Sequence, residues 1–224
     1  MCGRFTLRSP PDDVARAAGA MMDVGAFTPR NNIAPGQPVL VIRPGAAGPM
    51  RWGLVPSWAK DPAMGARLIN ARAETVAEKP VFRAAFRVRR CVVLADGFYE
   101  WQANPRGRGP KRPWFFHLKD DRPFAFAGLW ERWTGPEGSV ETCTILTTTA
   151  NALVATVHDR MPVILTVDTV ARWIATSADG IADLLAPCPA EAMAAYPVSD
   201  RVNRPANDDP SCAAPLGPAT GTLL

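Results

Sequence analysis

The sequence has few histidines and no closely spaced cysteines, which argues against a dedicated metal site. Its cysteines are Cys2, Cys91, Cys143, Cys188 and Cys212, and its histidines are His117 and His158. A structural zinc site needs about four clustered ligands, often with a CxxC pair, and this chain has no such pair. A disulfide framework is not expected either, because the cysteines are odd in number and widely spaced. We therefore expect no metal and no cofactor, and interpret the interior cysteines as small buried residues.

Long apolar runs are also missing. No stretch approaches the roughly 18 apolar residues of a membrane helix. The first residues, MCGRFTLRSPPDDV, carry charges where the apolar part of a signal peptide would lie. We therefore expect a cytoplasmic protein that does not bind membranes. The 224 residues, 47% of them hydrophobic, are enough for one sizeable domain with a full core.

Positive charge is in slight excess, with a net charge of +4. Basic residues form two clusters: Arg83, Arg87, Arg89 and Arg90, and then Arg106, Arg108, Lys111 and Arg112. Such clusters are compatible with a polyanionic partner, but they equally fit a solvated face and an exposed loop. We assign no role to the basic loop 103–112.

The pattern of apolar residues predicts an α+β fold. From Cys91 onward, runs rich in β-branched and aromatic residues alternate with turns rich in Gly, Pro and Arg. The predicted strands are 39–43, 91–95, 97–102, 114–118, 124–133, 140–147, 163–165 and 196–198. The predicted helices are 9–22 with Ser9 as N-cap, 73–86 with an interruption at Pro80, and short helices at 151–157, 168–176 and 180–186. We expect segment 26–37 to be a loop.

Strands in the middle and short helices at the flanks favour a single domain built on a curved, mainly antiparallel β-sheet or open barrel. We expect this domain to cover residues 1–205. Residues 206–224 are rich in Pro, Gly and Ala, and we interpret them as a flexible tail.

Cys2 is the first candidate for chemistry. Small second residues such as Cys permit removal of the initiator Met1, which leaves a free amine and a thiol on adjacent carbons. Their ordinary pKa values are roughly 8 and 8.5, so modest tuning makes either group nucleophilic. An aldehyde condenses with the amine to an imine, and the thiol then closes a five-membered thiazolidine ring. On its own, however, Cys2 is equally compatible with a chance second residue.

Several further motifs place polar and aromatic residues in turns that a scaffold could hold. They are RWGLVPSWAKD at 51–61, INARAET at 69–75, RRCVVLADGFYEW at 89–101, TILTTTANALVATVHDRMPVIL at 144–165 and YPVSDRVN at 196–203. Together with MCGRFTL at the start and NNIAPGQPV at 31–39, they resemble the SOS-response-associated peptidase (SRAP) family of abasic site processing proteins. The resemblance covers residues 2 to about 205.

The resemblance implies binding of single-stranded DNA at abasic sites during the response to DNA damage. Family members capture the opened sugar aldehyde through the N-terminal Cys and form a stable thiazolidine crosslink that shields the lesion. Some also cleave the strand by β-elimination through the imine, a lyase activity. The peptidase label refers to removal of the residue before Cys2, with autocatalysis as one route. The sequence shows no oligomeric surface, so a monomer is the default expectation, and we expect association with the nucleoid when the protein is bound to DNA.

Carried over by position, the resemblance assigns roles to individual residues. Cys2 is the nucleophile, Asn70 holds the N-terminus or the sugar, and Glu100 moves protons. His158 acts on the sugar during opening of the hemiacetal. The expected DNA contacts are phosphate binding by Arg4, Arg72 and Arg160, and packing against bases or ribose by Trp52 and Trp58.

Each of these residues also has a structural interpretation. Glu100 fits a solvent-facing strand position, His158 and Asn70 fit turn positions, and Arg72 fits an ion pair with Glu74 or Glu78. One or both of Trp52 and Trp58 fit the core.

Two other functions stay open. Glutamine amidotransferases with an N-terminal nucleophile also begin Met-Cys-Gly, although NARAET and GFYEW fit their glutamine pocket poorly. A non-catalytic module that binds single strands would use its aromatic residues alone, with Cys2 incidental.

Overall fold

The computed structural model describes residues 2–18, 28–104, 107, 109–136, 138–175 and 180–217. Its strands are β1 (Phe5–Leu7), β2 (Arg30–Ile33), β3 (Pro38–Arg43), β4 (Ala46–Trp52), β5 (Asn70–Arg72), β6 (Arg90–Ala95), β7 (Gly97–Gln102), β8 (Arg112–Leu118), β9 (Phe124–Gly135), β10 (Gly138–Thr149), β11 (Arg160–Pro162), β12 (Ile164–Leu165) and β13 (Met193–Pro197). The α-helices are α1 (Asp12–Ala17), α2 (Pro80–Val88) and α3 (Val167–Ala175), and the 3-10 helices are η2 (Pro62–Arg67), η3 (Ala73–Thr75), η4 (Val154–Thr156), η6 (Ala182–Leu185), η7 (Ala190–Ala192), η8 (Asp200–Asn203) and η9 (Pro210–Cys212).

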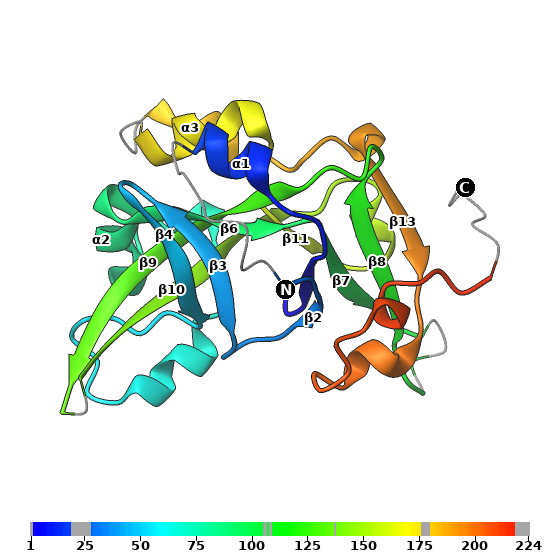
Figure 1. The fold of residues 1–224 in the computed structure, drawn as a ribbon, viewed down its shortest axis with the longest axis horizontal. Coiled ribbons are helices and arrows are strands. Elements are labelled where there is room, and N and C mark those ends of the chain that lie inside the picture. The colour runs from blue at the N-terminus through cyan, green and yellow to red at the C-terminus, as the bar shows by residue number, and fades with distance from the viewer. Residues whose placement is uncertain are drawn as a thin grey trace.

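These strands form two sheets (Figure 1). In the larger sheet, β10, β4, β3, β6 and β9 pair in that order, and β9 pairs with β10 again. The pairing therefore closes into a ring, which leaves these strands without an open edge along their paired lengths. The smaller sheet has the order β13-β8-β7-β1-β2 and is antiparallel throughout. The α+β fold with mainly antiparallel strands and short flanking helices is thus confirmed.

The chain passes from the larger sheet to the smaller one between β6 and β7, where Asp96 alone separates the two strands. Strand β6 has the sequence RCVVLA and is buried at every position, as expected for a central strand covered on both faces. Gly97 follows, and a Cβ atom there would lie 2.1 Å from the Phe115 ring. Only glycine lets β7 pass this closely under β8.

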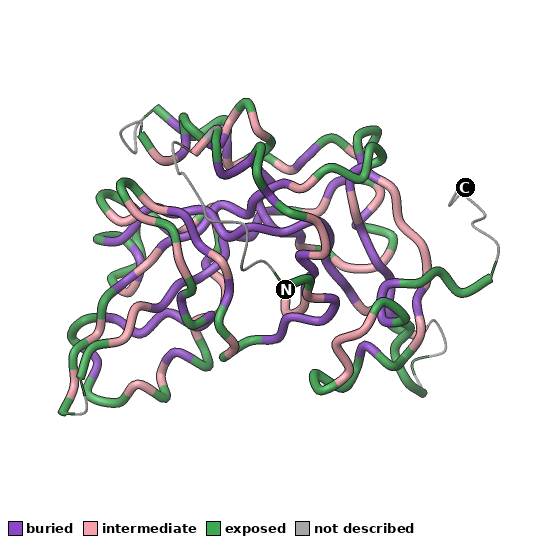
Figure 2. The backbone as a smooth tube through the Cα atoms, viewed as in Figure 1, coloured by how far each residue is buried: buried purple, intermediate pink, exposed green. Residues whose placement is uncertain are grey.

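The core continues from one sheet into the other (Figure 2). Phe5 of β1 packs edge-on against Trp52 at 5.2 Å and against Phe126 at 5.5 Å between ring centroids. All three side chains are completely buried. Each such ring removes a large apolar area from water, so this cluster fixes the start of the chain firmly between the sheets.

Part of the first basic cluster is structural. Arg90 is buried and donates from Nε to the Trp173 carbonyl and from Nη1 to the Phe86 carbonyl. Arg89 pairs with Glu131 at 2.7 Å. Arg83 and Arg87, in contrast, are exposed on α2. In the second cluster, Arg106 and Arg108 lie outside the described residues.

The predicted strands after Cys91 are all present with small shifts at their ends. The helix expected from Ser9 starts later, at Asp12, with Pro11 as the residue before it, and the backbone N–H of Ser9 donates to Asp96. Its expected continuation, from residue 19 to Met22, lies outside the described residues. Pro80 begins α2 rather than interrupting a longer helix, in keeping with the preference of proline for the first turn. Segment 26–37 contains strand β2, so its interpretation as a loop was wrong.

The flexible tail is corrected for residues 206–217. Cys212 and Ala213 are buried against Tyr99 and Phe115 of the smaller sheet. The Asp208 carboxylate accepts hydrogen bonds from the backbone N–H groups of Asn31 and Asn32, at 2.5 and 2.8 Å. This segment, orange to red in Figure 1, therefore packs onto the sheet. Composition suggested disorder, but specific hydrogen bonds outweigh it. Residues 218–224 lie outside the described part.

Among the described residues, no helix is both long enough and apolar enough to cross a membrane.

Candidate active site

Cys2 lies between the two sheets, just ahead of β1. Its side chain is completely buried, and Asn70 Nδ2 donates to its carbonyl oxygen at 2.8 Å. Burial raises the pKa of the Cys2 thiol, and the negative charge of Glu100 raises it further. The sequence placed Cys2, Asn70 and Glu100 in one site, and these contacts bring all three together. The raised pKa means that the thiol keeps its proton at neutral pH until a base takes it.

The backbone position of Asn70 is fixed by strand pairing and by a hydrogen bond to the residue before it. It begins β5, which runs parallel to β10 and pairs Asn70 with Ile145. The preceding carbonyl, of Ile69, accepts a hydrogen bond from the Trp52 indole at 2.9 Å. The Asn70 Oδ1 atom is buried and has no hydrogen-bond partner among the described residues. A buried acceptor without a partner is costly, so this oxygen is a natural place for a donor brought by the mature N-terminus or by substrate.

Glu100 is a buried carboxyl group on β7, with 3% of its surface exposed. The interpretation of Glu100 as a solvent-facing strand residue is therefore excluded. Burial raises its pKa to about 7, against lowering effects from the N-terminal amino group and smaller ones from the Trp101 backbone N–H and the charge of Lys111. A carboxyl group with such a pKa can both donate and accept a proton near neutral pH.

His158 lies between η4 and β11. Its Nδ1 atom accepts a hydrogen bond from the Arg160 backbone N–H at 3.0 Å, which places the ring proton on Nε2 in the neutral form. Burial lowers the pKa of His158 and favours that neutral form. The same Nδ1 atom lies 3.0 Å from Asp159 Oδ1, but this contact becomes an ion pair only when the ring is protonated. Since the Asp159 side chain is largely exposed, we take the backbone hydrogen bond as the one that fixes the ring.

Strand β10 carries residues of the site on both of its edges. Thr147 of β10 pairs with Arg72 of β5 on one edge and with Pro162 of β11 on the other. Asn70 and Arg72 therefore lie across β10 from Arg160, which opposes Thr149. This arrangement explains how the INARAET and HDRMP motifs, far apart in the sequence, meet at one site.

The two arginines beside β10 differ in their partners. Arg160 binds Glu74 through both terminal nitrogens, at 2.6 and 2.9 Å, and also donates to the Thr147 carbonyl at 2.6 Å. This bidentate pair lowers the pKa of Glu74. Arg72 is exposed, and within the described residues no carboxylate pairs with it. Glu74 thus pairs with Arg160 rather than with Arg72.

Arg4 and Trp52 have partners within the protein, and the DNA contacts expected of them stay predictions. Arg4 Nη1 donates to Asn32 Oδ1 at 2.7 Å and to the Val202 carbonyl, so its guanidinium ties the chain start to β2 and the C-terminal segment. Trp52 is completely buried, and its indole N–H donates to the Ile69 carbonyl. It is therefore the tryptophan of the two that lies in the core. Trp58 is 62% exposed and remains available to a base.

Sequence reasoning missed Asp96, which fixes the segment behind Cys2. Its carboxylate is buried and accepts hydrogen bonds from Thr6 Oγ1 at 2.5 Å and from the backbone N–H groups of Arg8 and Ser9, at 2.5 and 2.9 Å. The Asp96 N–H in turn donates to the Thr6 carbonyl. Asp96 stands inside the motif ADGFYEW, so the motif marked the position without indicating its role.

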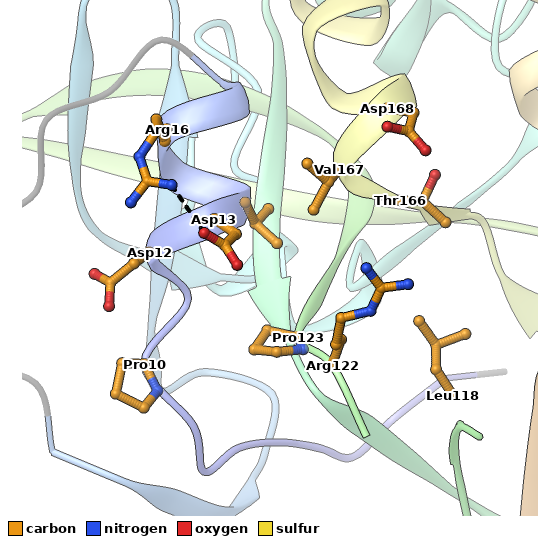
Figure 3. A pocket seen from close by; sticks show the side chains of 11 residues that line it. Pro10, Asp12, Asp13, Arg16, Leu118, Arg122, Pro123, Thr166, Val167 and Asp168 are labelled. Atoms are coloured by element: carbon orange, nitrogen blue, oxygen red, sulfur yellow. Dashed lines mark hydrogen bonds and ion pairs between the residues drawn. The ribbon is translucent and has the colours of Figure 1, made fainter. Parts of the chain in front are cut away.

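None of the expected site residues lines the cavity of about 720 Å³ between the starts of α1 and α3 (Figure 3). Asp12, Asp13 and Asp168 face it, and Arg16 pairs with Asp13 across its wall. Within the described residues, no group of three His, Cys, Asp or Glu side chains could bind a metal ion.

Comparison with known proteins shows the family of this chain. The family model described as SOS response associated peptidase (SRAP) matches residues 1–205. The chain is 45% identical to the abasic site processing protein YoqW of Bacillus subtilis over 94% of this chain and 97% of that protein. It is 31% identical to the abasic site processing protein HMCES of Xenopus tropicalis, over 96% of this chain and 78% of that protein. A crystal structure of a protein from Bacteroides thetaiotaomicron has a similar fold, with a TM-score of 0.85 and 27% identity over 96% of this chain and all of that one.

Proposed function

The chain belongs to the SOS response associated peptidase (SRAP) family, and we propose that it processes abasic sites in single-stranded DNA by bonding covalently to them through Cys2. The names of its relatives support abasic sites as the substrate. The single observation that carries the covalent step is the burial of Glu100 beside Cys2, which gives a carboxyl group with a pKa of about 7 at the N-terminal nucleophile.

The proposed reaction begins after Met1 is removed. The Cys2 amine attacks the aldehyde carbon of the opened sugar, and the resulting carbinolamine loses water to form an imine. The Cys2 sulfur then adds to the imine carbon, and the thiol proton ends on the nitrogen of the five-membered ring. Because the pKa of the thiol is raised, the amine reacts first and the thiol follows only when a base is at hand.

Glu100 is the proposed proton carrier for both steps. Protonated, it supplies the proton that leaves with water; ionised, it takes the thiol proton and returns it to nitrogen. A single group can do both because its pKa lies near neutral pH. The Asn70 amide holds the Cys2 carbonyl, and its unpartnered Oδ1 accepts from the amine and orients it.

His158 is proposed to assist the opening of the sugar ring. An abasic sugar is mostly a closed hemiacetal, which opens when its ring oxygen gains a proton and the hydroxyl on the anomeric carbon loses one. The neutral imidazole, with Nδ1 accepting from the Arg160 backbone, donates a hydrogen bond from Nε2 to the ring oxygen and so stabilises the charge that develops there, while the two protons exchange with water. The imine also permits β-elimination, in which a base removes a proton next to the imine carbon and the neighbouring phosphate leaves. We propose this lyase step as a slower branch.

For DNA binding, we propose Arg72 and Trp58 as direct contacts. Arg72 offers an unpaired guanidinium, and Trp58 offers a mostly exposed ring on which any base can stack. Arg160 contributes by fixing Glu74 and the His158 loop, and its part in phosphate binding is secondary.

The test is incubation of the purified protein with single-stranded DNA containing one abasic site, followed by denaturing electrophoresis and intact mass measurement. We expect a heat-stable adduct whose mass equals protein without Met1 plus DNA minus one water. Cys2→Ala should give no stable adduct, and Glu100→Gln should slow its formation by about 10²- to 10⁴-fold.

Two results would replace this proposal. Turnover of glutamine without any DNA adduct would favour an N-terminal-nucleophile amidohydrolase. Adduct formation by Cys2→Ala at the wild-type rate, or by protein whose N-terminal amine is verifiably blocked, would rule out the thiazolidine.

A further inference from the structure

Lys111 stands at the start of β8, on the same hairpin as Glu100. In the β7–β8 ladder, Glu100 pairs with Trp114 and Gln102 pairs with Arg112. Lys111 is therefore the next residue beyond the last pair, at the end of the hairpin that Glu100 occupies. The side chain is exposed.

The same end of the hairpin is fastened to the loop that carries His158. Gln102 Nε2 donates to the Thr156 carbonyl at 3.0 Å, and Gln102 Oε1 accepts from the Trp114 indole at 3.2 Å. Thr156 is two positions before His158 in the chain. The Gln102 side chain thus joins the loop end of the β7–β8 hairpin to the segment that carries His158, and Lys111 lies at this junction.

Electrostatics agree with that placement. The positive charge of Lys111 makes a small contribution to lowering the pKa of both Glu100 and His158, in keeping with its place at the end of the hairpin that is fastened to the His158 loop. In the described part of the chain, no carboxylate pairs with Lys111. The site therefore has an exposed cation without a counter-ion, beside the two groups expected to act on the sugar.

We propose that Lys111 binds the phosphodiester group next to the abasic sugar. This inference rests on the proposed function, since it takes the sugar to lie between Glu100 and His158. A cation adjoining both groups then comes within reach of a flanking phosphate. A lysine suits this task because its ammonium acts as a point charge toward any phosphate oxygen, without regard to base sequence.

The test measures equilibrium binding to a single-stranded oligonucleotide that carries a stable abasic analogue without an aldehyde, so that no crosslink forms. Wild type, Lys111→Gln and Lys111→Arg are compared over a series of salt concentrations. The matched control is Lys119→Gln, which removes an exposed lysine at the opposite end of the same strand. Two further oligonucleotides each replace one phosphate flanking the lesion by an uncharged methylphosphonate.

We expect Lys111→Gln to weaken binding about two- to fivefold and to reduce the salt slope by about 0.7, the value for one lost contact on a single strand. Lys111→Arg should restore binding, and Lys119→Gln should match wild type. The penalty of Lys111→Gln should vanish on one of the two methylphosphonate oligonucleotides, which identifies the phosphate.

An unchanged salt slope, or an equal penalty on all three oligonucleotides, would overturn the inference. Failure of the proposed function is a separate result: wild-type protein would then form no adduct with natural abasic DNA, whatever Lys111→Gln does to binding.

Discussion

At the scale of single residues, the raised pKa of Glu100 links catalysis to stability. The pKa is about 7 in the folded protein against an ordinary value of 4.5, because burial disfavours the charged form. The folded state therefore holds this proton more tightly than the unfolded chain. The stabilisation is complete below about pH 4.5 and is lost as the pH rises through about 7.

Replacing Glu100 by Gln removes this pH dependence. We expect Glu100→Gln to gain unfolding free energy relative to wild type as the pH rises from 5 to 8, by up to about 3 kcal/mol. Urea unfolding of both proteins at the two pH values checks this. A stability difference that stays constant over this range would show that Glu100 ionises at its ordinary pKa, and the role of proton carrier at neutral pH would lose its basis.

Trp58 gives a second prediction at this scale. Its ring is 62% exposed, so truncation costs the fold little, whereas a base stacked on it contributes about 1–3 kcal/mol. We expect Trp58→Ala to weaken binding of abasic single-stranded DNA by about five- to hundredfold, with unfolding free energy changed by less than about 0.5 kcal/mol. Val88→Ala, which trims another exposed apolar side chain, is the matched control. Equal affinity in both variants would remove Trp58 from the interface.

The sequence could not separate Trp58 from Trp52, although both stand in RWGLVPSWAKD. The difference is tertiary: Trp52 ends a barrel strand and meets Phe5, whereas Trp58 lies in the loop beyond it. The partners of Arg4 and Arg160 were hidden for the same reason, since Asn32, Val202 and Glu74 are distant in the sequence. The residue types in a motif indicate what chemistry is available. Whether a given side chain is buried or paired depends on residues distant in the sequence that the fold brings into contact with it.

At the scale of elements, strands rich in β-branched and aromatic residues were predictable, whereas β4, rich in Ala, Gly and Pro, and the very short β1 and β5 were not. Strands β6 and β7 carry their own signal in RCVVLA and GFYEWQ. Strands β1 and β5 have three residues each, too few for a period of alternation to be visible, and exist because β7 and β10 supply their partners. Strand β1 follows shortly after Cys2, and β5 begins with Asn70. The positions of both residues therefore depend on strands that the apolar pattern of the sequence does not predict.

Asp96 maintains the alignment of β1 with β7 and gives the prediction at this scale. Its carboxylate accepts two backbone N–H groups and the Thr6 hydroxyl, and an amide retains only one acceptor oxygen. We expect Asp96→Asn to lower the unfolding free energy by about 1–3 kcal/mol and to slow crosslinking at saturating DNA, because Cys2 is held less firmly. Asp13→Asn, at an exposed position, should change neither. Wild-type crosslinking by a destabilised Asp96→Asn would show that alignment of β1 does not limit the chemistry.

At the scale of the whole molecule, the C-terminal segment closes the smaller sheet on its open side. Strand β2 is an edge strand, and an edge exposes backbone N–H groups that invite pairing with other chains. Here the Asp208 carboxylate accepts from two of those groups and pairs with Arg30. The same segment buries Cys212 over Tyr99, whose hydroxyl donates to the Asn31 carbonyl at 2.7 Å. Asp208 and Cys212 thereby hold the C-terminal segment against β2 and the smaller sheet.

Removing this carboxylate tests whether the segment is part of the folded unit. We expect Asp208→Ala to lower the unfolding free energy by about 2 kcal/mol, because it leaves backbone donors of β2 without a partner and Arg30 without its counter-ion. Asp200→Ala, which removes an exposed aspartate just before this segment, is the control and should stay within about 0.5 kcal/mol of wild type. Hydrogen exchange should also speed up at Asn31 and Asn32 in Asp208→Ala alone. Equal stability and equal exchange in the two variants would mean that residues 206–217 contribute nothing to holding β2, and the original interpretation of a flexible tail would return.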